Sequence, residues 1–539
     1  MVDPEVDGRI EVNGAMMGVT QRLMPTIVLR PILIALSTVL AFFGGACVPA
    51  NEAQTAGPKS SSLRHLLIVL DGLRPDYVTL ELMPNLHALG QRGVVFANHH
   101  AVYPTVTRVN ASSISTGAYP SAHGLLGNSV FFADVDATRF LSTGERQNLL
   151  AVERVEGGRL LTVPTMAEQL QGAGLSLLVV SAGSTGSSFL LNHTIAGGGI
   201  IHYEYALPPP LFEDVVKRLG VAPAAAIPND SRNRYVVDAF FDVGLPQIDP
   251  TVTLMWLSDP DATAHAHGIG HPMTQTSLAR LDAEVGRILS RLDDAALLSD
   301  VNIWVTSDHG FSTHTGAVDL SVVLDPFHGT LDDGSPRIVE GEGAIYVRDN
   351  DGRTIEGIVA TLQSLPRVGA IFTRAASPGS LDGAVPGTLS FDAVSWNHPR
   401  SAEILYSANW TDEQNEFGYA GTSAQNGVAG HGSSSPFDIH NVLIAAGPQL
   451  RSGTTVDLAS GAVDFAPTFL SLLELEVPSS MRGRVLREAF DDGPDPGSIA
   501  LEATSHTVES EDRRYRLTVH SSTVSGHRYL DYTEVARTP

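Results

Sequence analysis

Aspartate and histidine side chains follow several apolar segments of this sequence, where they could bind divalent metal ions. The chain has 539 residues and one cysteine, Cys47, which excludes a disulfide framework and a cysteine-based zinc site. A metal site would therefore use imidazole nitrogens and carboxylate oxygens, which both suit zinc. The candidate ligands are Asp71, Asp261, His265, Asp308, His309 and His431.

The segment from Tyr103 to Asn128 could do a second kind of chemistry, because it is rich in Ser and Thr hydroxyls and almost free of charge. One interpretation is a polar loop followed by a helix. The other is that one of these hydroxyls is a nucleophile, which a metal ion or a neighbouring base would have to activate. A helix is expected from Arg108 to Thr116, so Thr107 would lie at its N-terminus, where threonine also serves as an N-cap.

The elements that must position these residues can be read from the apolar pattern. Continuous apolar runs occupy residues 65–70, 175–180, 253–257, 301–306 and 441–446, and helical patterns cover 84–92, 165–171 and 274–293. Runs of this kind are typical of strands buried on both faces of a parallel sheet. Strands alternating with helices predict a doubly wound α/β fold with a mostly parallel central sheet flanked by helices. Functional residues of such sheets gather at the carboxyl ends of the strands, and three of the runs end in candidate ligands.

Two further regions differ in composition from this pattern. Residues 311–430 are rich in Gly, Asp and Ser and poor in long apolar runs, so we expect an inserted cap within a catalytic domain of residues 63–500. Residues 501–539 form a C-terminal tail with a weak strand pattern, YRLTVH, that could pack on the core.

The N-terminus is typical of an export signal. Arg22 and Arg30 precede the apolar run 31–46, which is too short for a membrane span and ends in small residues before Cys47. Residues 1–47 are thus similar to a bacterial lipoprotein signal with Cys47 as the lipidated residue; the alternatives are a plain cleaved signal or a short anchor. Residues 48–62 are expected to be a flexible linker. The prediction is an exported protein, periplasmic or at the cell surface, with membrane attachment through the N-terminus as one arrangement.

Taken together, the motifs resemble a known family. Asp71-Gly72, Pro104-Thr-Val-Thr107, Asp261 with His265, Asp308-His309-Gly310 and Gly430-His431-Gly432 occur in the order seen in the alkaline phosphatase superfamily. The branch they resemble is that of the type I phosphodiesterases and nucleotide pyrophosphatases. The resemblance implies two divalent metal ions, normally zinc. By position, the first would be held by Asp261, His265 and His431, and the second by Asp71, Asp308 and His309 together with the oxygen of Thr107.

The same resemblance implies roles for three further residues. Thr107 would be the nucleophile, and Asn128 would donate a hydrogen bond to a phosphate oxygen. The backbone N–H groups at the helix N-terminus would face the phosphate. Arg108 stands where nucleotide pyrophosphatases usually carry an aromatic residue, so it could contact substrate or point into solvent. Taken alone, Asn128 would be a turn residue.

These roles predict a metal-dependent phosphodiesterase or nucleotide pyrophosphatase-like hydrolase that forms a covalent phospho-threonine intermediate. The alternatives are a phosphonoacetate-type C–P hydrolase, a phosphomonoesterase of the same superfamily and, with least support, a non-catalytic surface binding protein. No Lys or Arg lies between Arg159 and Lys217, where a monoesterase branch supplies cations, and this favours a diester. The net charge of −25 argues against a nucleic-acid surface. The expected partner is a small-molecule phosphate ester.

Overall fold

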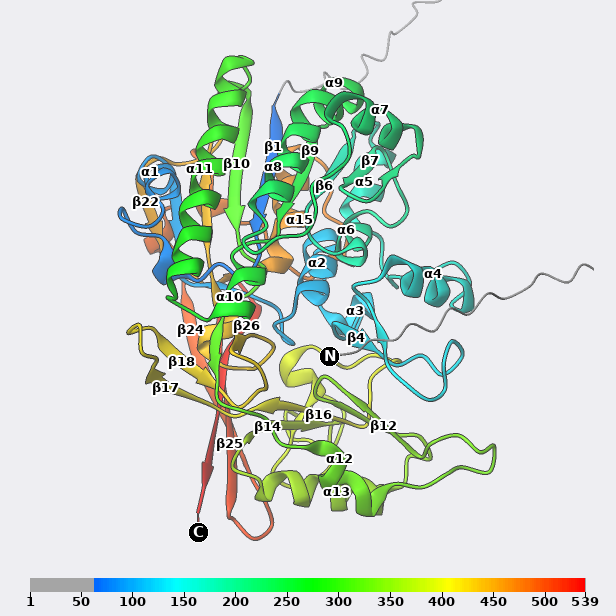
Figure 1. The fold of residues 1–539 in the computed structure, drawn as a ribbon. Helices are drawn as coiled ribbons and strands as arrows, with labels where there is room; N and C mark the ends of the chain where they lie inside the picture. The colour runs from blue at the N-terminus through cyan, green and yellow to red at the C-terminus, as the bar shows by residue number, and fades with distance from the viewer. Residues whose placement is uncertain (1–62, 539) are drawn as a thin grey trace, which may run out of the picture. The chain divides into compact units, whose positions relative to one another are not determined.

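The central element of the computed structural model, which describes residues 63–538, is a sheet of nine strands (Figure 1). The predicted signal segment 1–47 and linker 48–62 lie outside the described residues, so export and lipidation stay predictions. In sheet order the strands are β22 (Thr454–Val456), β2 (Val94–Phe96), β21 (Leu443–Ala446), β10 (Val301–Thr306), β1 (Arg64–Leu70), β9 (Val252–Leu257), β6 (Leu177–Ser181), β7 (Gly199–His202) and β8 (Ala206–Leu207).

The middle of this sheet is parallel, as predicted. Strand β1 pairs in parallel with β10 on one side and with β9 on the other, and β9 pairs in parallel with β6. Every residue of β9, β10 and β6 is buried, which explains why these strands read as continuous apolar runs. Strand β21 runs antiparallel to both of its neighbours, so the sheet is mixed at that edge.

Helices cover both faces of the sheet and form two separate apolar cores, which confirms the doubly wound fold. One core contains buried residues of α1 (Pro84–Gln91), α7 (Pro210–Leu219), α8 (Asp230–Ala239) and α11 (Pro272–Asp294). The other contains residues of α2 (Thr107–Thr116), α4 (Arg146–Val155), α5 (Met166–Gly172), α6 (Thr185–Leu191) and α15 (Phe465–Leu472). The three- and four-residue spacing of apolar residues in α11 predicts a stripe of Leu278, Leu281, Val285, Ile288, Leu289 and Leu292, of which all but Leu289 are buried and Leu289 is half-buried.

The segment predicted to be a cap forms two small sheets of its own and lies below the central sheet in Figure 1. The first consists of β12 (Ile338–Gly341), β13 (Ala344–Val347), β16 (Ile404–Ala408), β14 (Val368–Thr373) and β15 (Leu389–Ser390). The second consists of β17 (Trp410–Gln414), β18 (Ala420–Ser423), β11 (Ser312–His314) and β19 (Ala429–Gly430). Helices α12 (Leu320–Leu324) and α13 (Gly352–Ser364) accompany them. The limits 311–430 of this cap stay an interpretation of the sequence.

The C-terminal tail is more regular than its sequence pattern suggested. It forms three antiparallel strands, β24 (Leu501–Glu509), β25 (Tyr515–Val524) and β26 (His527–Arg537). Tyr515, Leu517 and Val519 are buried in the same apolar cluster as the strands of the cap. The YRLTVH pattern marked only the middle strand, because β24 is almost wholly exposed and has no apolar face to recognise.

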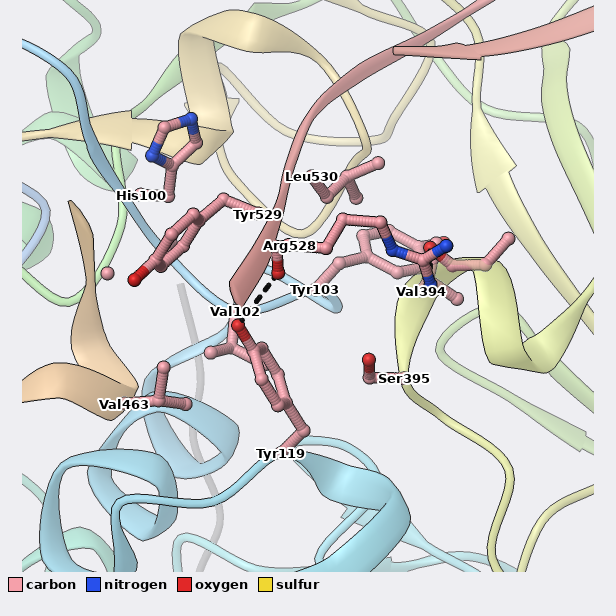
Figure 2. Close-up of a pocket in the computed structure, with 13 residues that line it drawn as sticks. His100, Val102, Tyr103, Tyr119, Val394, Ser395, Val463, Arg528, Tyr529 and Leu530 are labelled. Atoms are coloured by element: carbon pink, nitrogen blue, oxygen red, sulfur yellow. Dashed lines mark hydrogen bonds between the residues drawn. The ribbon is translucent and has the colours of Figure 1, made fainter. Parts of the chain in front are cut away.

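Strand β26 also docks on the catalytic domain, where it closes a small cavity (Figure 2). The Tyr119 hydroxyl donates to the backbone oxygen of Arg528 at 3.1 Å. The Tyr529 hydroxyl donates to Asp464 Oδ2 at 2.9 Å. The cavity measures about 20 Å³, room for a water molecule but not for a substrate. The tail is therefore a fixed part of the fold.

Within residues 63–538, no helix combines the length and the apolar character that a membrane crossing requires.

Candidate active site

Three adjacent strands of the central sheet deliver five of the six predicted ligands to one edge. Asp71 directly follows β1, and Asp308 and His309 follow its neighbour β10. On the other side of β1, strand β9 leads into α10 (Asp261–His267). Because Asp261 and His265 are four residues apart in this helix, they lie on the same helix face. The backbone N–H of Asp261 donates to the backbone oxygen of Asp71 at 3.0 Å, and this bond joins the ends of β9 and β1.

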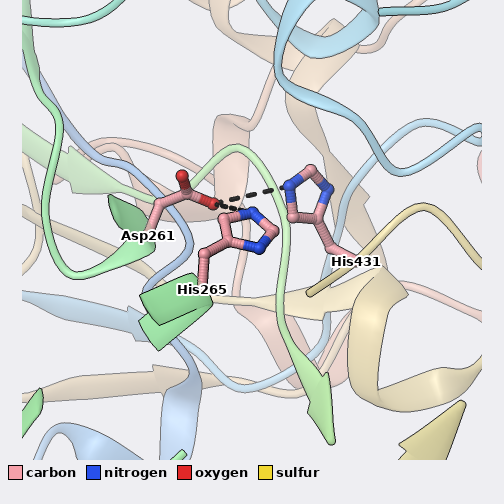
Figure 3. Close-up of side chains that lie close together, drawn as sticks. All are labelled: Asp261, His265 and His431. Atoms are coloured by element: carbon pink, nitrogen blue, oxygen red, sulfur yellow. Dashed lines mark ion pairs between the residues drawn. The ribbon is translucent and has the colours of Figure 1, made fainter. Parts of the chain in front are cut away.

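The sixth residue, His431, comes from the far end of the cap. Strand β19 pairs with β11, with Gly430 opposite Ser312, and this pairing carries His431 back to the edge of the central sheet. Figure 3 shows the result: the imidazoles of His265 and His431 both point at the carboxylate of Asp261. The distances from Asp261 Oδ1 are 3.2 Å to His265 Nε2 and 3.4 Å to His431 Nε2. These three side chains form the first group.

Asp71, Asp308 and His309 form a second group and are all buried. His309 Nε2 lies 3.1 Å from Asp308 Oδ2 and 3.5 Å from Asp71 Oδ1. In each of the two groups, one potential ligand atom per residue falls within 4.8 Å of the others. The residues that were separated in the sequence thus converge in the two sets that the family resemblance implies.

The histidines are held in the form that metal ligation requires. In each ring Nδ1 faces a backbone oxygen: that of Ala429 for His265 at 2.9 Å, that of Gly310 for His309 at 3.0 Å, and that of Thr105 for His431 at 2.8 Å. A carbonyl oxygen can only accept, so Nδ1 of each ring carries a proton, and Nε2 is the nitrogen turned toward the carboxylates, where a metal ion would bind. Such backbone contacts are typical of metal-binding histidines.

The carboxylates also fit a metal site. Asp71 Oδ1, Asp261 Oδ1 and Asp308 Oδ2 are buried and have no hydrogen-bond donor among the described residues. Burial, together with the charges of Asp308 and Asp261, raises the pKa of Asp71 well above its ordinary value. Burial likewise raises the pKa of Asp308 to about 7. Buried carboxylates this close together need compensating positive charge, which two divalent cations would supply.

Thr107 lies at the N-terminus of α2, beside the second group. Its Oγ1 is 3.4 Å from His309 Nε2, and the residue is only 6% exposed. Val106 is the N-cap of this helix, and no side chain makes a capping hydrogen bond there. The N-cap interpretation of Thr107 therefore does not hold, and its hydroxyl is left to face the metal-ligand residues.

The other hydroxyls of this segment have structural roles. Ser112 Oγ donates to the backbone oxygen of Arg108 at 2.9 Å, and Thr116 Oγ1 donates to the backbone oxygen of Ser112 at 2.6 Å. Ser113 Oγ lies 3.1 Å from His123 Nε2. These contacts satisfy polar groups inside a buried helix, where an unpaired hydroxyl would cost stability. Among the Ser and Thr residues of α2, Thr107 is the one that lies beside the metal-ligand groups.

Asn128 is oriented by the same helix end. Its Oδ1 accepts from the backbone N–H of Arg108 at 3.0 Å, so the orientation of the amide is set and its NH₂ group remains available as a donor. Asn128, His265 and His431 line a cavity of about 490 Å³ between the sheet edge and the cap, a size typical of small-molecule sites.

Arg108 takes a different direction. A Cβ built on Gly144 would meet its guanidinium, so the side chain lies against that glycine, and Arg108 is not among the described residues that line the cavity. Substrate contact by Arg108 stays a prediction, and the geometry offers it no support.

Sequence reasoning missed one residue of the site. Trp256 Nε1 donates to Asp71 Oδ2 at 2.8 Å, which fixes the carboxylate whose other oxygen faces His309. Trp256 is fully buried in β9, and in the sequence it belongs to an ordinary apolar run. The one available signal was that a buried Trp needs an acceptor for its N–H.

Gly430 gives a test of this geometry. A Cβ at this position would lie 2.5 Å from His314 Cε1 and 3.0 Å from His265 Cε1, so Gly430→Ala must displace His314 and also crowds the His265 imidazole of the first group. We expect the variant to bind zinc about tenfold more weakly or worse, measured by competition with a chelator. Gly352→Ala is the matched control, because nothing lies within 4 Å of its Cβ position. Equal zinc affinity in the two variants would contradict the role given to His265.

Comparisons with known proteins agree with this geometry. A family model described as type I phosphodiesterase / nucleotide pyrophosphatase matches residues 65–411. Ectonucleotide pyrophosphatase/phosphodiesterase family member 1 of Rattus norvegicus is 26% identical over 282 residues, which cover 52% of this chain and 27% of the rat protein. Bis(5′-adenosyl)-triphosphatase enpp4 of Xenopus laevis is 25% identical over 287 residues, covering 51% and 54%. The chain thus spans about half or less of these relatives.

Among solved structures, human ectonucleotide pyrophosphatase/phosphodiesterase 5 shares the fold, with a TM-score of 0.55 and 18% identity over 80% of this chain and all of that chain. The family match covers more than half of the sequence and includes five of the six metal-ligand candidates, the exception being His431. The chain therefore belongs to the type I phosphodiesterase/nucleotide pyrophosphatase family, within the alkaline phosphatase superfamily.

Proposed function

We propose that this protein is a dinuclear-metal phosphoesterase that hydrolyses phosphodiester or pyrophosphate bonds through a covalent phospho-threonine intermediate. The observation that carries the proposal is the position of Thr107: its hydroxyl lies at a helix N-terminus, 3.4 Å from His309 Nε2, beside two converging Asp/His groups. Family membership supports the reaction class.

The residues present fit two zinc ions. Asp261, His265 and His431 would hold one, and Asp71, Asp308 and His309 would hold the other. When bound, such ions supply Lewis acidity that lowers the pKa of a coordinated hydroxyl and stabilises charge on phosphoryl oxygens.

The chain's own groups carry the rest of the reaction. The Thr107 hydroxyl gives up its proton to solvent as its oxygen forms a bond to phosphorus, while the bond to the leaving oxygen breaks and that oxygen takes up a proton from solvent. Water later attacks phosphorus and breaks its bond to the Thr107 oxygen, and the hydroxyl is restored by a proton from that water. The Asn128 NH₂ group donates to a nonbridging oxygen, because its Oδ1 is already engaged by Arg108 N–H. The positive end of α2 favours negative charge beside Thr107.

A diester or pyrophosphate substrate is favoured over a monoester by the charge of the cavity. Arg367 is the one Lys or Arg among the described residues that line it, and its Nη1 is already bonded to the backbone oxygen of Thr315 at 2.7 Å. A doubly charged monoester would need more cationic partners. The names of relatives agree: several are venom phosphodiesterases, and the Xenopus protein is a bis(5′-adenosyl)-triphosphatase. A murine relative was solved as an inactive threonine-to-alanine variant in complex with AMP.

A substrate panel tests the proposal. Purified zinc-loaded protein is assayed with bis(p-nitrophenyl) phosphate, p-nitrophenyl phosphate and phosphonoacetate. We expect kcat/KM to be highest for the diester, by about tenfold or more. The diester has one anionic oxygen fewer than the monoester, and the described residues that line the cavity include no free Lys or Arg side chain to pair with that additional charge. Faster release of phosphate from phosphonoacetate would identify a C–P hydrolase instead, and preference for the monoester a phosphomonoesterase. Inactivity toward all three would favour a binding protein.

A further inference from the structure

A β-hairpin of the cap reaches the segment that carries Asn128. Strands β12 and β13 pair with Gly341 opposite Ala344, so a two-residue turn, Glu342-Gly343, joins them. Both turn residues have left-handed backbones, with φ of 46° at Glu342 and 87° at Gly343, as a type I′ turn requires. Gly, Asn and Asp fit the first position of such a turn, whereas a longer side chain is strained there. A glutamate at this position thus costs the hairpin stability.

The Glu342 carboxylate makes two contacts with one residue of the catalytic domain. Its Oε2 accepts from the backbone N–H of Ser129 at 2.7 Å, and its Oε1 accepts from Ser129 Oγ at 2.8 Å. Bonds to a carboxylate are among the stronger hydrogen bonds, and a two-point contact also fixes direction. Glu342 and Asn128 both line the cavity of about 490 Å³.

Ser129 directly follows Asn128 and begins the short strand β4 (Ser129–Val130), which pairs with β5 (Leu141–Ser142). Asn128 itself is hydrogen-bonded to Thr143. The backbone N–H and the Oγ1 of Thr143 donate to the backbone oxygen of Asn128 at 2.9 and 2.6 Å. The backbone of Asn128 is therefore held by Thr143 from the catalytic domain and, through Ser129, by Glu342 from the cap. An amide that must meet a phosphate oxygen works only if its backbone is fixed this well.

We propose that Glu342 is a positioning residue: by binding Ser129 it fixes the Asn128 amide toward the phosphate and couples the cap to the catalytic domain. The inference rests on the proposed function in that Asn128 is taken as the phosphate donor. It accounts for the presence of a strained glutamate at a turn where glycine would fit better, since backbone strain of this kind is found at functional sites.

The chain offers a matched control for the test. Ser525-Gly526 joins β25 and β26 in the same kind of turn, with φ of 51° and 83° and with Val524 opposite His527, away from the cavity. Glu342→Gly and Ser525→Gly both remove a side chain from a left-handed position, so both variants should keep or raise Tm. Both should also keep the zinc content of the wild type, because neither residue is a metal ligand.

The two variants should differ at the active site. In zinc-loaded protein, Glu342→Gly should lower kcat/KM for bis(p-nitrophenyl) phosphate about tenfold and weaken binding of inorganic phosphate, measured by calorimetry, by a similar factor. Ser525→Gly should change neither. Glu342→Gln keeps one acceptor oxygen for Ser129 and should recover most of the loss.

Wild-type activity and phosphate affinity in Glu342→Gly would overturn the proposal. So would a fall in Tm or zinc content beyond that of Ser525→Gly, because the effect would then be general. The phosphate measurement needs no turnover, so the positioning role of Glu342 is tested even if the wild type hydrolyses none of the panel. That outcome would count against the proposed function alone.

Discussion

Thr107→Ala is expected to lower kcat for bis(p-nitrophenyl) phosphate by about a thousandfold or more, because no other hydroxyl of α2 can take over the attack. The remaining Ser and Thr side chains of the helix are buried and engaged, as Ser112 and Thr116 show by donating to backbone oxygens one turn away. The Thr107 side chain makes no cap and lies at the helix end, so its loss should leave Tm within a few degrees of the wild type. Steady-state kinetics and thermal unfolding check both statements.

Two controls separate the nucleophile from the helix. Thr107→Ser keeps a hydroxyl at the same place and should retain activity within about a hundredfold of the wild type, with incorporation of ³²P from a labelled diester into the chain. Ser112→Ala removes a buried hydroxyl one turn further on and should affect stability more than turnover. Near-normal turnover by Thr107→Ala would rule out the covalent mechanism.

Asp308→Asn is expected to separate activity from stability. Asp308 is fully buried; its Oδ1 accepts from the Gly72 N–H at 3.1 Å, a bond that asparagine can keep, while Oδ2 faces the metal-ligand cluster. Replacing Oδ2 by an NH₂ group removes a ligand and points a donor at the site. We expect loss of one zinc ion per chain by elemental analysis and a fall in kcat/KM of about a hundredfold or more.

The same variant should not be less stable than the wild type once zinc is removed from both by a chelator. In the metal-free protein, burial and the charge of Asp261 raise the pKa of Asp308 to about 7, and the neutral asparagine removes the cost of ionising a buried carboxylate there. Asp332→Asn changes an exposed aspartate of the cap by the same atoms and should leave zinc content, activity and Tm unchanged. Two zinc ions per chain in Asp308→Asn would remove this residue from the ligand set.

The fold could be predicted wherever burial leaves a local pattern. Strands β9 and β10 are buried along their length and β1 is buried from His65 onward, so all three read as apolar runs, and α11 shows its stripe at three- and four-residue spacing. The antiparallel direction of β21 and the exposed strand β24 left no such pattern, because apolar content records burial and not strand direction or pairing partner.

The candidate site likewise has features that the sequence predicts and features that only the folded chain reveals. The sequence by itself determined the ligand types and placed Asp71, Asp261 and Asp308 after strands, since the carboxyl ends of parallel strands meet at one edge. Only the tertiary structure decided that β19 returns His431 to that edge, that Trp256 binds Asp71, and that Glu342 reaches Ser129. The physical reason is the sequence separation of the contacts. The secondary-structure propensity and polarity of a short segment can be read from its own residues, whereas contacts between residues more than a hundred positions apart depend on the packing of the whole chain.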